Sequence, residues 1–111
     1  MVKHKNYILG NWIAGDGEGL ELHNAISGDV LGTCSSEGLD YLQIMDFAKN
    51  KGGVALRKMT FQVRGRMLKA LAFHLLNIKE KFYTLSAATG ATKIDSWIDI
   101  EGGIGNLFAN A

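Results

Sequence analysis

The sequence predicts an α+β fold, with short strands and hairpins in residues 6–34 followed by three to four helices in residues 36–111. Two observations support this class. In the first part, glycines separate short apolar segments. The chain has no proline, so its turns depend on glycine. From residue 36 onward, apolar residues recur every three or four positions, which is the period of one helix face. Hydrophobic residues make up 47% of the chain, which argues against intrinsic disorder.

The first 34 residues predict a β-meander. Ile8 and Trp12 flank Gly10-Asn11, a suitable pair for a tight turn, and residues 15–19 are expected to form a second loop. Residues 21–24 and 30–34 then read as two strands joined by a turn at residues 27–29. These segments are too short to bury much apolar surface alone, so we expect them to pair with one another.

Two helices are predicted after the strands. Ser36 or Asp40 can cap the first helix, which we expect to stop at Gly52-Gly53. The second helix is expected to begin at Thr60 and to be bent or broken at Asn77, because its apolar periodicity is long for a small domain. We expect Gly90 to end this element.

A last helix is predicted from a capping box formed by Thr92 and Asp95. Gly102, Gly103 and Gly105 fall inside this helix, and each costs roughly 1 kcal/mol relative to alanine. Only packing could offset such a loss, for example where another backbone approaches closely. No turn signal precedes the last residue, so we expect the chain to be a truncated piece of a longer protein.

Charge and composition exclude several classes of protein. The net charge of +1 predicts no strong attraction to nucleic acid or to anionic membranes. No apolar run approaches the roughly 20 residues that a bilayer-spanning helix needs, and the first residues lack a secretory signal. The single cysteine cannot form an internal disulfide. We therefore expect a cytoplasmic protein that binds neither nucleic acid nor membrane.

Cys34 is the one candidate nucleophile. His23 could face it across paired strands and lower its pKa, as thiolate chemistry requires. A strand cysteine more often packs as a small hydrophobe, and that is the interpretation we prefer. His4, His23 and His74 are too widely spaced for a local metal motif, and no second cysteine assists them. We predict neither a catalytic residue nor a transition-metal site.

Glycine-rich stretches do not predict a cofactor site. Gly103-Ile104-Gly105 begins like a dinucleotide fingerprint, but Phe108 occupies the third glycine position and no strand precedes it. The loop at residues 15–19 carries two acidic residues that would repel phosphate. We expect turn and packing roles for both stretches, and no cofactor bound by this chain.

Two charged groups are predicted to be solvated rather than functional. The basic group comprises Arg57-Lys58 and Arg64-Gly65-Arg66, and it lacks the broad basic face with stacking aromatics that nucleic-acid binding needs. The acidic group lies on the last helix and consists of Asp95, Asp99 and Glu101. A hard-cation site is an alternative there only if backbone carbonyls converge on one of these carboxylates.

The order of several motifs resembles the first part of an aldehyde dehydrogenase. These motifs are Tyr7-Ile-Leu-Gly-Asn-Trp12, Ser27-Gly-Asp-Val30, two amphipathic helices and the junction Thr89-Gly90-Ala-Thr-Lys93. A tyrosine-rich segment of that family corresponds here to Leu107-Phe108-Ala109. The resemblance implies that residues 1–111 are the N-terminal part of such an enzyme, and that its nucleotide-binding and catalytic regions lie outside this sequence.

Three further segments resemble a narrower group, the bifunctional ring-opening enzymes of bacterial phenylacetate degradation, called the PaaZ type. They are Cys34-Ser-Ser-Glu-Gly-Leu-Asp40, Gly52-Gly-Val-Ala-Leu-Arg57 and Asp99-Ile-Glu-Gly-Gly-Ile104. This resemblance implies a dehydrogenase domain that oxidises a CoA-linked semialdehyde with NADP or NAD, joined to an oxepin-CoA hydrolase domain. In that family the reaction uses a cysteine thiolate, an oxyanion hole and a glutamate, and none of these maps onto the present residues.

The resemblance also implies one cation site. Some relatives hold a monovalent cation between an early strand carbonyl and an acid of the last helix, and the matching positions are Leu22 or His23 and Asp99. The expected partners are the rest of the parent enzyme and further copies of the chain, since apolar surface would remain exposed. Two alternatives stay open, a stand-alone helical interaction module without catalysis and an enzyme complete within 111 residues.

Overall fold

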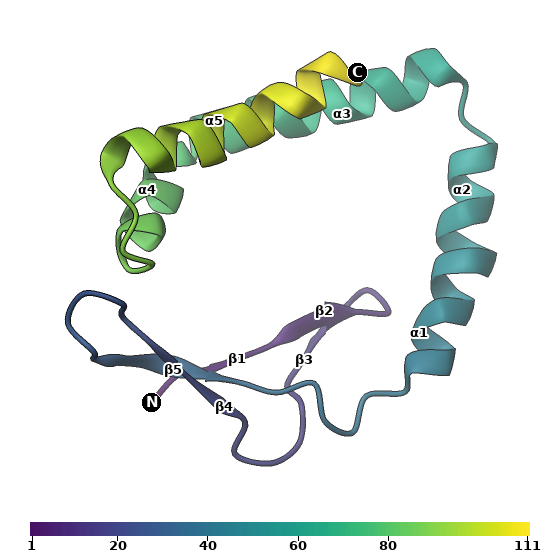
Figure 1. Cartoon of the computed structure of the whole chain (residues 1–111). Helices are drawn as coiled ribbons and strands as arrows, with labels where there is room; N and C mark the ends of the chain where they lie inside the picture. The colour runs from purple at the N-terminus through teal and green to yellow at the C-terminus, as the bar shows by residue number, and fades with distance from the viewer. The chain divides into compact units, whose positions relative to one another are not determined.

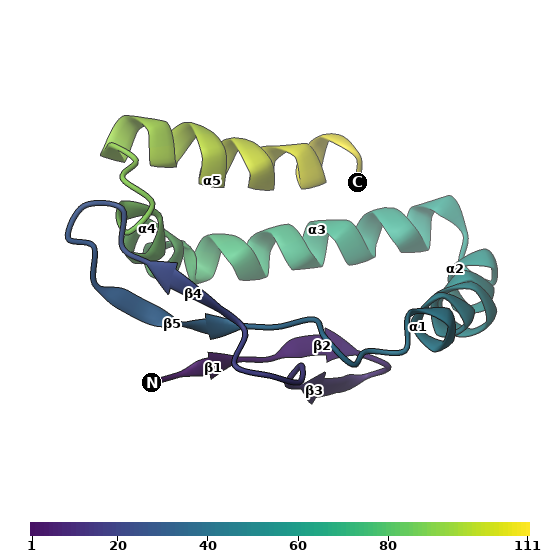
Figure 2. The ribbon, with the colours of Figure 1, turned by 60° about the horizontal axis from the view of Figure 1, so that its bottom comes forward.

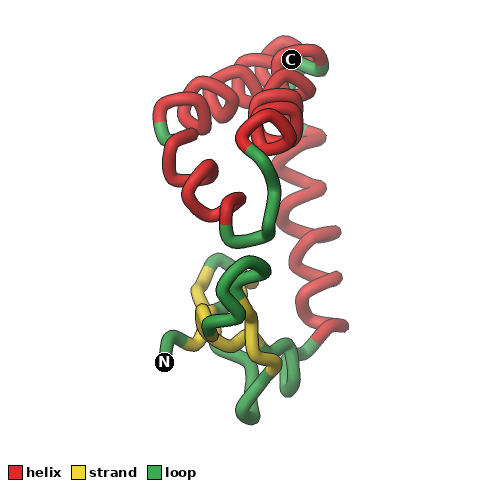
Figure 3. Tube along the Cα trace, turned by 60° about the vertical axis from the view of Figure 1, so that its left-hand side comes forward, coloured by secondary structure: helices red, strands yellow, loops and turns green.

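The computed structural model describes residues 1–111, which form two compact units, Met1–Ala55 and Leu56–Ala111. Strands and loops dominate the first unit, and helices make up most of the second (Figure 3). Five short strands and four helical stretches are present, so the predicted α+β class is confirmed. No helix combines the length and the apolar character that crossing a bilayer requires.

The strands form two small sheets rather than one meander. A three-stranded sheet has the order β1-β5-β4, and a separate hairpin pairs β2 with β3 (Figure 1). Both predicted hairpins are confirmed, but the single meander is wrong because β1 lies parallel to β5. A two-residue strand carries too little alternation to be recognised in a sequence. The strands are β1 (Lys3–His4), β2 (Asn6–Ile8), β3 (Asn11–Ile13), β4 (Leu20–His23) and β5 (Val30–Cys34).

The β2–β3 hairpin turns at Leu9-Gly10, one residue earlier than predicted. Both residues have positive φ, 53° for Leu9 and 77° for Gly10, as the common two-residue hairpin turn requires. The side chain of Asn11 donates a hydrogen bond of 3.2 Å to the Leu9 carbonyl. Asparagine therefore stabilises the turn from the first position of the following strand, while leucine adopts the unusual backbone conformation.

The first helical stretch combines α1 (Tyr41–Phe47), the π-helical segment η1 (Ala48–Gly52) and α2 (Gly53–Arg57). Asp40 caps it by accepting a hydrogen bond of 3.0 Å from the Gln43 amide. The predicted stop at Gly52-Gly53 is wrong. Glycine ends a helix when it turns left-handed, whereas Gly53 has φ −61° and ψ −40° and continues it.

The helical unit contains α3 (Phe61–Asn77), α4 (Lys79–Ala87) and α5 (Lys93–Ala109). Thr60 caps α3 with a hydrogen bond of 3.2 Å from the Val63 amide, as predicted. The predicted break at Asn77 and the end signal at Gly90, where φ is 85°, are both present. Helix α5 packs against α4 and runs antiparallel beside α3 (Figure 2).

The core of the helical unit is small. Ala72 and Ile104 are buried apolar residues, and Ser96 is also buried, with its hydroxyl 2.8 Å from that of Ser86. Phe73 and Phe108 extend the contact between α3 and α5 through edge-to-face packing of their rings, with centroids 5.1 Å apart. Many large apolar side chains remain exposed, including Phe61 at 84% and Ile94 at 71%. The unit therefore leaves several large apolar side chains on its surface.

The three glycines inside α5 do not meet another backbone within this chain. A Cβ atom added to Gly102, Gly103 or Gly105 would lie more than 4 Å from every atom outside the helix itself. The expectation of a close backbone approach is thus not met by residues 1–111. The glycines lower the helix propensity of α5 without a compensating contact in this structure.

Candidate functional site

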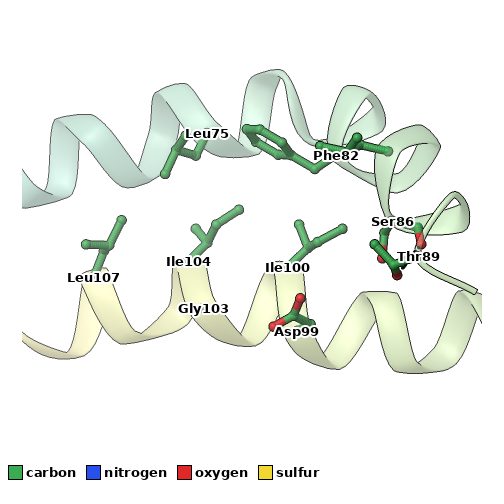
Figure 4. Close-up of a pocket in the computed structure, with 10 residues that line it drawn as sticks. Leu75, Phe82, Ser86, Thr89, Asp99, Ile100, Gly103, Ile104 and Leu107 are labelled. Atoms are coloured by element: carbon green, nitrogen blue, oxygen red, sulfur yellow. Dashed lines mark hydrogen bonds between the residues drawn. The ribbon is translucent and has the colours of Figure 1, made fainter. Parts of the chain in front are cut away.

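The main candidate site is a groove of about 410 Å³ between α5 and the α3–α4 pair, called here the interhelical groove (Figure 4). Leu75 of α3 and Phe82 of α4 lie on one side, and the side chains of Ile100, Ile104 and Leu107 point toward them from α5. The three α5 positions recur at the helical period, so a single face of α5 supplies its side of the groove.

The groove is open rather than filled. Ile104 lies deep within it and is 5% exposed, whereas Leu85 on α4 is 64% exposed. Gly103 lines the groove without a side chain, so no atom of α5 closes it there. Removing apolar surface of this extent from water is favourable. The geometry therefore suits docking of an apolar group.

Asp99 is the one charged residue that lines the interhelical groove. The structure has two ion pairs, His23–Glu21 and Lys79–Glu101, and Asp99 takes part in neither. Ser86 and Thr89 add hydroxyl groups near the α4 end of the groove. The groove thus combines an apolar wall with one carboxylate that has no cationic partner.

A polar cluster joins α4 to α5 next to a second hollow. The Glu101 carboxylate accepts hydrogen bonds from the Lys79 ammonium at 2.8 Å and from the Tyr83 hydroxyl at 2.5 Å. Lys79 and Tyr83 are four residues apart and therefore share one face of α4. The prediction that Glu101 is merely solvated is wrong, because its side chain is 23% exposed and ion-paired.

The cluster shifts the pKa of all three groups. The hydrogen bond to Glu101 raises the pKa of Tyr83 to about 12, with burial and the negative charge of Glu101 adding to the effect. Hydrogen bonds from Lys79 and Tyr83 lower the pKa of Glu101. The hydrogen bond to Glu101 and its charge raise the pKa of Lys79. Each shift favours the protonation state that keeps the cluster together, which identifies it as a structural clamp.

Cys34 and His23 do not face each other. In the β4–β5 ladder Cys34 lies opposite Leu20, while His23 lies opposite Val30 beyond a bulge, so the pairing considered from sequence is wrong. His23 instead contacts Glu21 at 3.3 Å. The register neighbour of Cys34 on its other side is His4 of β1. Cys34 is half-buried and is a free thiol.

The predicted cation site stays a prediction. Leu22 and His23 lie in β4 of the first unit, and Asp99 lies on α5 of the second. No group of three or more His, Cys, Asp and Glu side chains is placed to hold a metal ion. His74 lies in the last turn of α3 and joins no such group.

The glycine-rich stretches do not fit a dinucleotide. Gly103 and Gly105 lie in the interior of α5, where their amides belong to the helix rather than to a phosphate cradle. In the loop at residues 15–19, the Asp16 amide donates a hydrogen bond of 2.9 Å to the Glu37 carbonyl. Neither stretch therefore forms a phosphate cradle in this structure, and the absence of a cofactor from this chain stays a prediction.

One member of the basic group has a structural role. The Arg64 guanidinium donates two hydrogen bonds to the Leu56 carbonyl, the one from Nε measuring 2.9 Å. Arg64 therefore ties the first turn of α3 to Leu56 within the second unit. No contact of this kind was evident in the sequence, because the two residues are eight positions apart.

The chain is similar to a curated dehydrogenase. Over 104 residues it is 36% identical to 3,4-dehydroadipyl-CoA semialdehyde dehydrogenase from Aromatoleum evansii. The match covers 93% of this chain and 20% of the relative, so the chain spans about a fifth of that protein's length. No protein-family model matches the chain. The similarity confirms the resemblance to aldehyde dehydrogenases, and specifically to one named for a CoA-linked semialdehyde.

Proposed function

We propose that this chain is the N-terminal scaffold of a CoA-linked semialdehyde dehydrogenase and that it supplies packing surfaces rather than reacting groups. The 36% identity across 93% of the chain supports this proposal most directly. An identity that extends through both units favours a shared fold over a shared local motif. The scaffold role agrees with an apolar groove and exposed helix faces in place of a nucleophile and base.

The parent enzyme, on this proposal, oxidises a CoA-linked semialdehyde in aerobic phenylacetate degradation in the cytoplasm. The aldehyde, water and NAD(P)⁺ give the acid, NAD(P)H and protons, with the nicotinamide accepting the hydride. As in the PaaZ type, the dehydrogenase is expected to be fused to an oxepin-CoA hydrolase domain. The present residues hold neither the nucleotide nor the substrate, so the chain alone is expected to be inactive.

The partners follow from the exposed surface. In the parent enzyme, α3 and α5 are proposed to pack against the rest of the polypeptide, which is absent from residues 1–111. Without that polypeptide, Phe61, Leu85 and Ile94 remain more than 60% exposed, so the isolated chain is expected to self-associate. Sedimentation velocity over a concentration series measures this, and a monomer at every concentration would contradict it.

A stand-alone helical interaction module is the second candidate function. The observation in its favour is that Leu56–Ala111 is a compact unit with its own capped helices and its own groove. Such a module would bind its partner without any contribution from a larger enzyme. The two proposals make opposite predictions for a chimera in which this chain replaces the matched stretch of the relative.

A chimera distinguishes them. Residues of this chain replace the matched stretch of the Aromatoleum evansii relative, and formation of NAD(P)H from its semialdehyde is followed. The scaffold proposal predicts turnover by the chimera and none by the isolated chain under the same conditions. A relative lacking the matched stretch serves as the control and should be inactive. An intact, folded chimera without turnover would contradict the scaffold proposal.

A further inference from the structure

We propose that the interhelical groove receives an apolar segment from the remaining polypeptide of the parent enzyme, and that this segment places a lysine or arginine beside Asp99. The inference rests on the proposed scaffold function and adds the place and chemistry of one contact. It concerns residues of α4 and α5 that no part of the catalytic reaction requires.

The groove walls indicate that the docked segment is apolar. Phe82, Ile100 and Leu107 are only half-buried, and Leu85 is mostly exposed, although all four face one hollow. Aliphatic and aromatic groups inserted there would remove apolar surface from water on both partners. Gly103 leaves room for the inserted group at the middle of the α5 wall. An apolar side chain or helix ridge therefore fits better than a polar ligand.

Asp99 indicates that the docked segment carries a basic residue. An apolar segment laid along the groove would cover this carboxylate and remove part of its hydration, which is unfavourable for an unpaired charge. No cation of this chain forms an ion pair with it. A basic side chain on the incoming segment offsets the loss and fixes the register of docking. The occupant is thus amphipathic, with one positive charge near its apolar residues.

A second copy of the chain fits this groove less well. In a symmetric dimer built on the groove, the same patch meets itself, so the two Asp99 carboxylates would lie on one interface without a cation lining either groove. Like charges brought together in an apolar interface disfavour that pairing. The relative, in contrast, is about five times as long as the matched stretch and provides polypeptide outside it.

Photo-crosslinking in the chimera tests the inference. A benzophenone amino acid replaces Leu85 within the groove, and in a control it replaces Lys81, an exposed residue of α4 that does not line the groove. The expected result is an intramolecular crosslink from position 85 to residues outside the transplanted stretch. Peptide mapping should find a lysine or arginine within about one helical turn of that point. Position 81 should give at least tenfold less of this product.

Three variants test the charge. Asp99→Lys should lower the yield of the crosslink at least tenfold, while Asp99→Glu should retain it. Glu80→Lys is the matched control, because Glu80 is an exposed acid of α4 that lies outside the groove. Replacing sodium and potassium with tetramethylammonium should leave the yield unchanged. A loss under that exchange would show that Asp99 holds a monovalent cation and would overturn the basic partner.

The remaining outcomes separate this inference from the proposed function. An active chimera whose crosslink joins two protomers, or which forms no crosslink at position 85, overturns the inference and leaves the scaffold function standing. A folded chimera without turnover contradicts the scaffold function itself. Should the chimera not accumulate, the two crosslinking positions are tested at the aligned residues of the Aromatoleum evansii relative, with the same outcomes deciding.

Discussion

The Tyr83 hydroxyl donates a hydrogen bond of 2.5 Å to the Glu101 carboxylate and so links α4 to α5. Lys79, one turn earlier on α4, binds the other oxygen of the same carboxylate. The link lies on a different face of α5 from the wall of the interhelical groove. Glu101 lines a second hollow together with Lys79 and Tyr83, whereas Ile100 and Ile104 line the interhelical groove. This clamp holds α5 at the position that leaves the groove open.

The clamp predicts a loss of stability in alkali. The pKa of Tyr83 is raised from its ordinary value of 10.0 to about 12, so its contribution is complete below pH 10 and is lost as pH rises toward 12. Chemical denaturation of the chain and of Tyr83→Phe from pH 8 to 11.5 measures this. The difference in unfolding free energy should shrink above pH 10. A difference that stays constant would contradict the clamp.

The Glu101 carboxylate of the same clamp predicts a loss of stability in acid. The pKa of Glu101 is lowered from its ordinary value of 4.5, so its contribution is complete above pH 4.5 and disappears as pH falls through the lowered pKa. Glu101→Gln should therefore be less stable than the original chain at pH 7, and the two stabilities should converge as the pH falls through the lowered pKa of Glu101. Urea titrations at a series of pH values from 7 downward give the comparison, and equal stability at pH 7 would contradict the prediction.

Ile104 is predicted to be the apolar side chain on which the helical unit most depends. Its replacement in Ile104→Ala deletes buried methylene groups and should destabilise the unit by about 2–4 kcal/mol. Ile98→Ala is the matched control on the same helix, because Ile98 is 59% exposed and should change stability by less than about 0.5 kcal/mol. Similar losses in both variants would show that the core lies elsewhere.

The glycines of α5 predict that alanine substitutions will stabilise the isolated chain. Gly102→Ala and Gly105→Ala place a methyl group where nothing lies within 4 Å, so each should stabilise the isolated chain by roughly 0.5–1 kcal/mol through helix propensity. Thermal unfolding followed by circular dichroism measures the change. Destabilisation of the isolated chain by either substitution would mean that another backbone does approach α5, for example in a self-associated form.

Local signals in the sequence located most of the helix boundaries. Thr60 and the Thr92–Asp95 pair mark helix starts through hydrogen bonds among residues close in the chain, and such contacts can be recognised without a structure. Asn77 is the last residue of α3, where the break was predicted. The helix end predicted at Gly52-Gly53 was wrong because glycine permits the left-handed conformation that ends a helix but does not impose it. The parallel pairing of β1 with β5 joins residues about 30 positions apart, and no local pattern encodes it.

The candidate site was less accessible from sequence. The period of α5 correctly grouped Ile100 and Ile104 on one face, but only the structure shows that α3 and α4 leave this face partly uncovered. The capping box distinguished Asp95 in the sequence, but Glu101 and Asp99 looked equivalent there although their environments differ. That difference depends on how α4 lies against α5, which no local residue pattern specifies.

The coding sequence downstream of residue 111 tests the central claim most directly. The scaffold account predicts an open reading frame that continues into a glycine-rich strand–turn–helix segment and a later cysteine, for a total length near that of the relative, about five times the matched stretch. A transcript from the source cells that ends with a stop codon immediately after Ala111 would contradict it and would favour the stand-alone module.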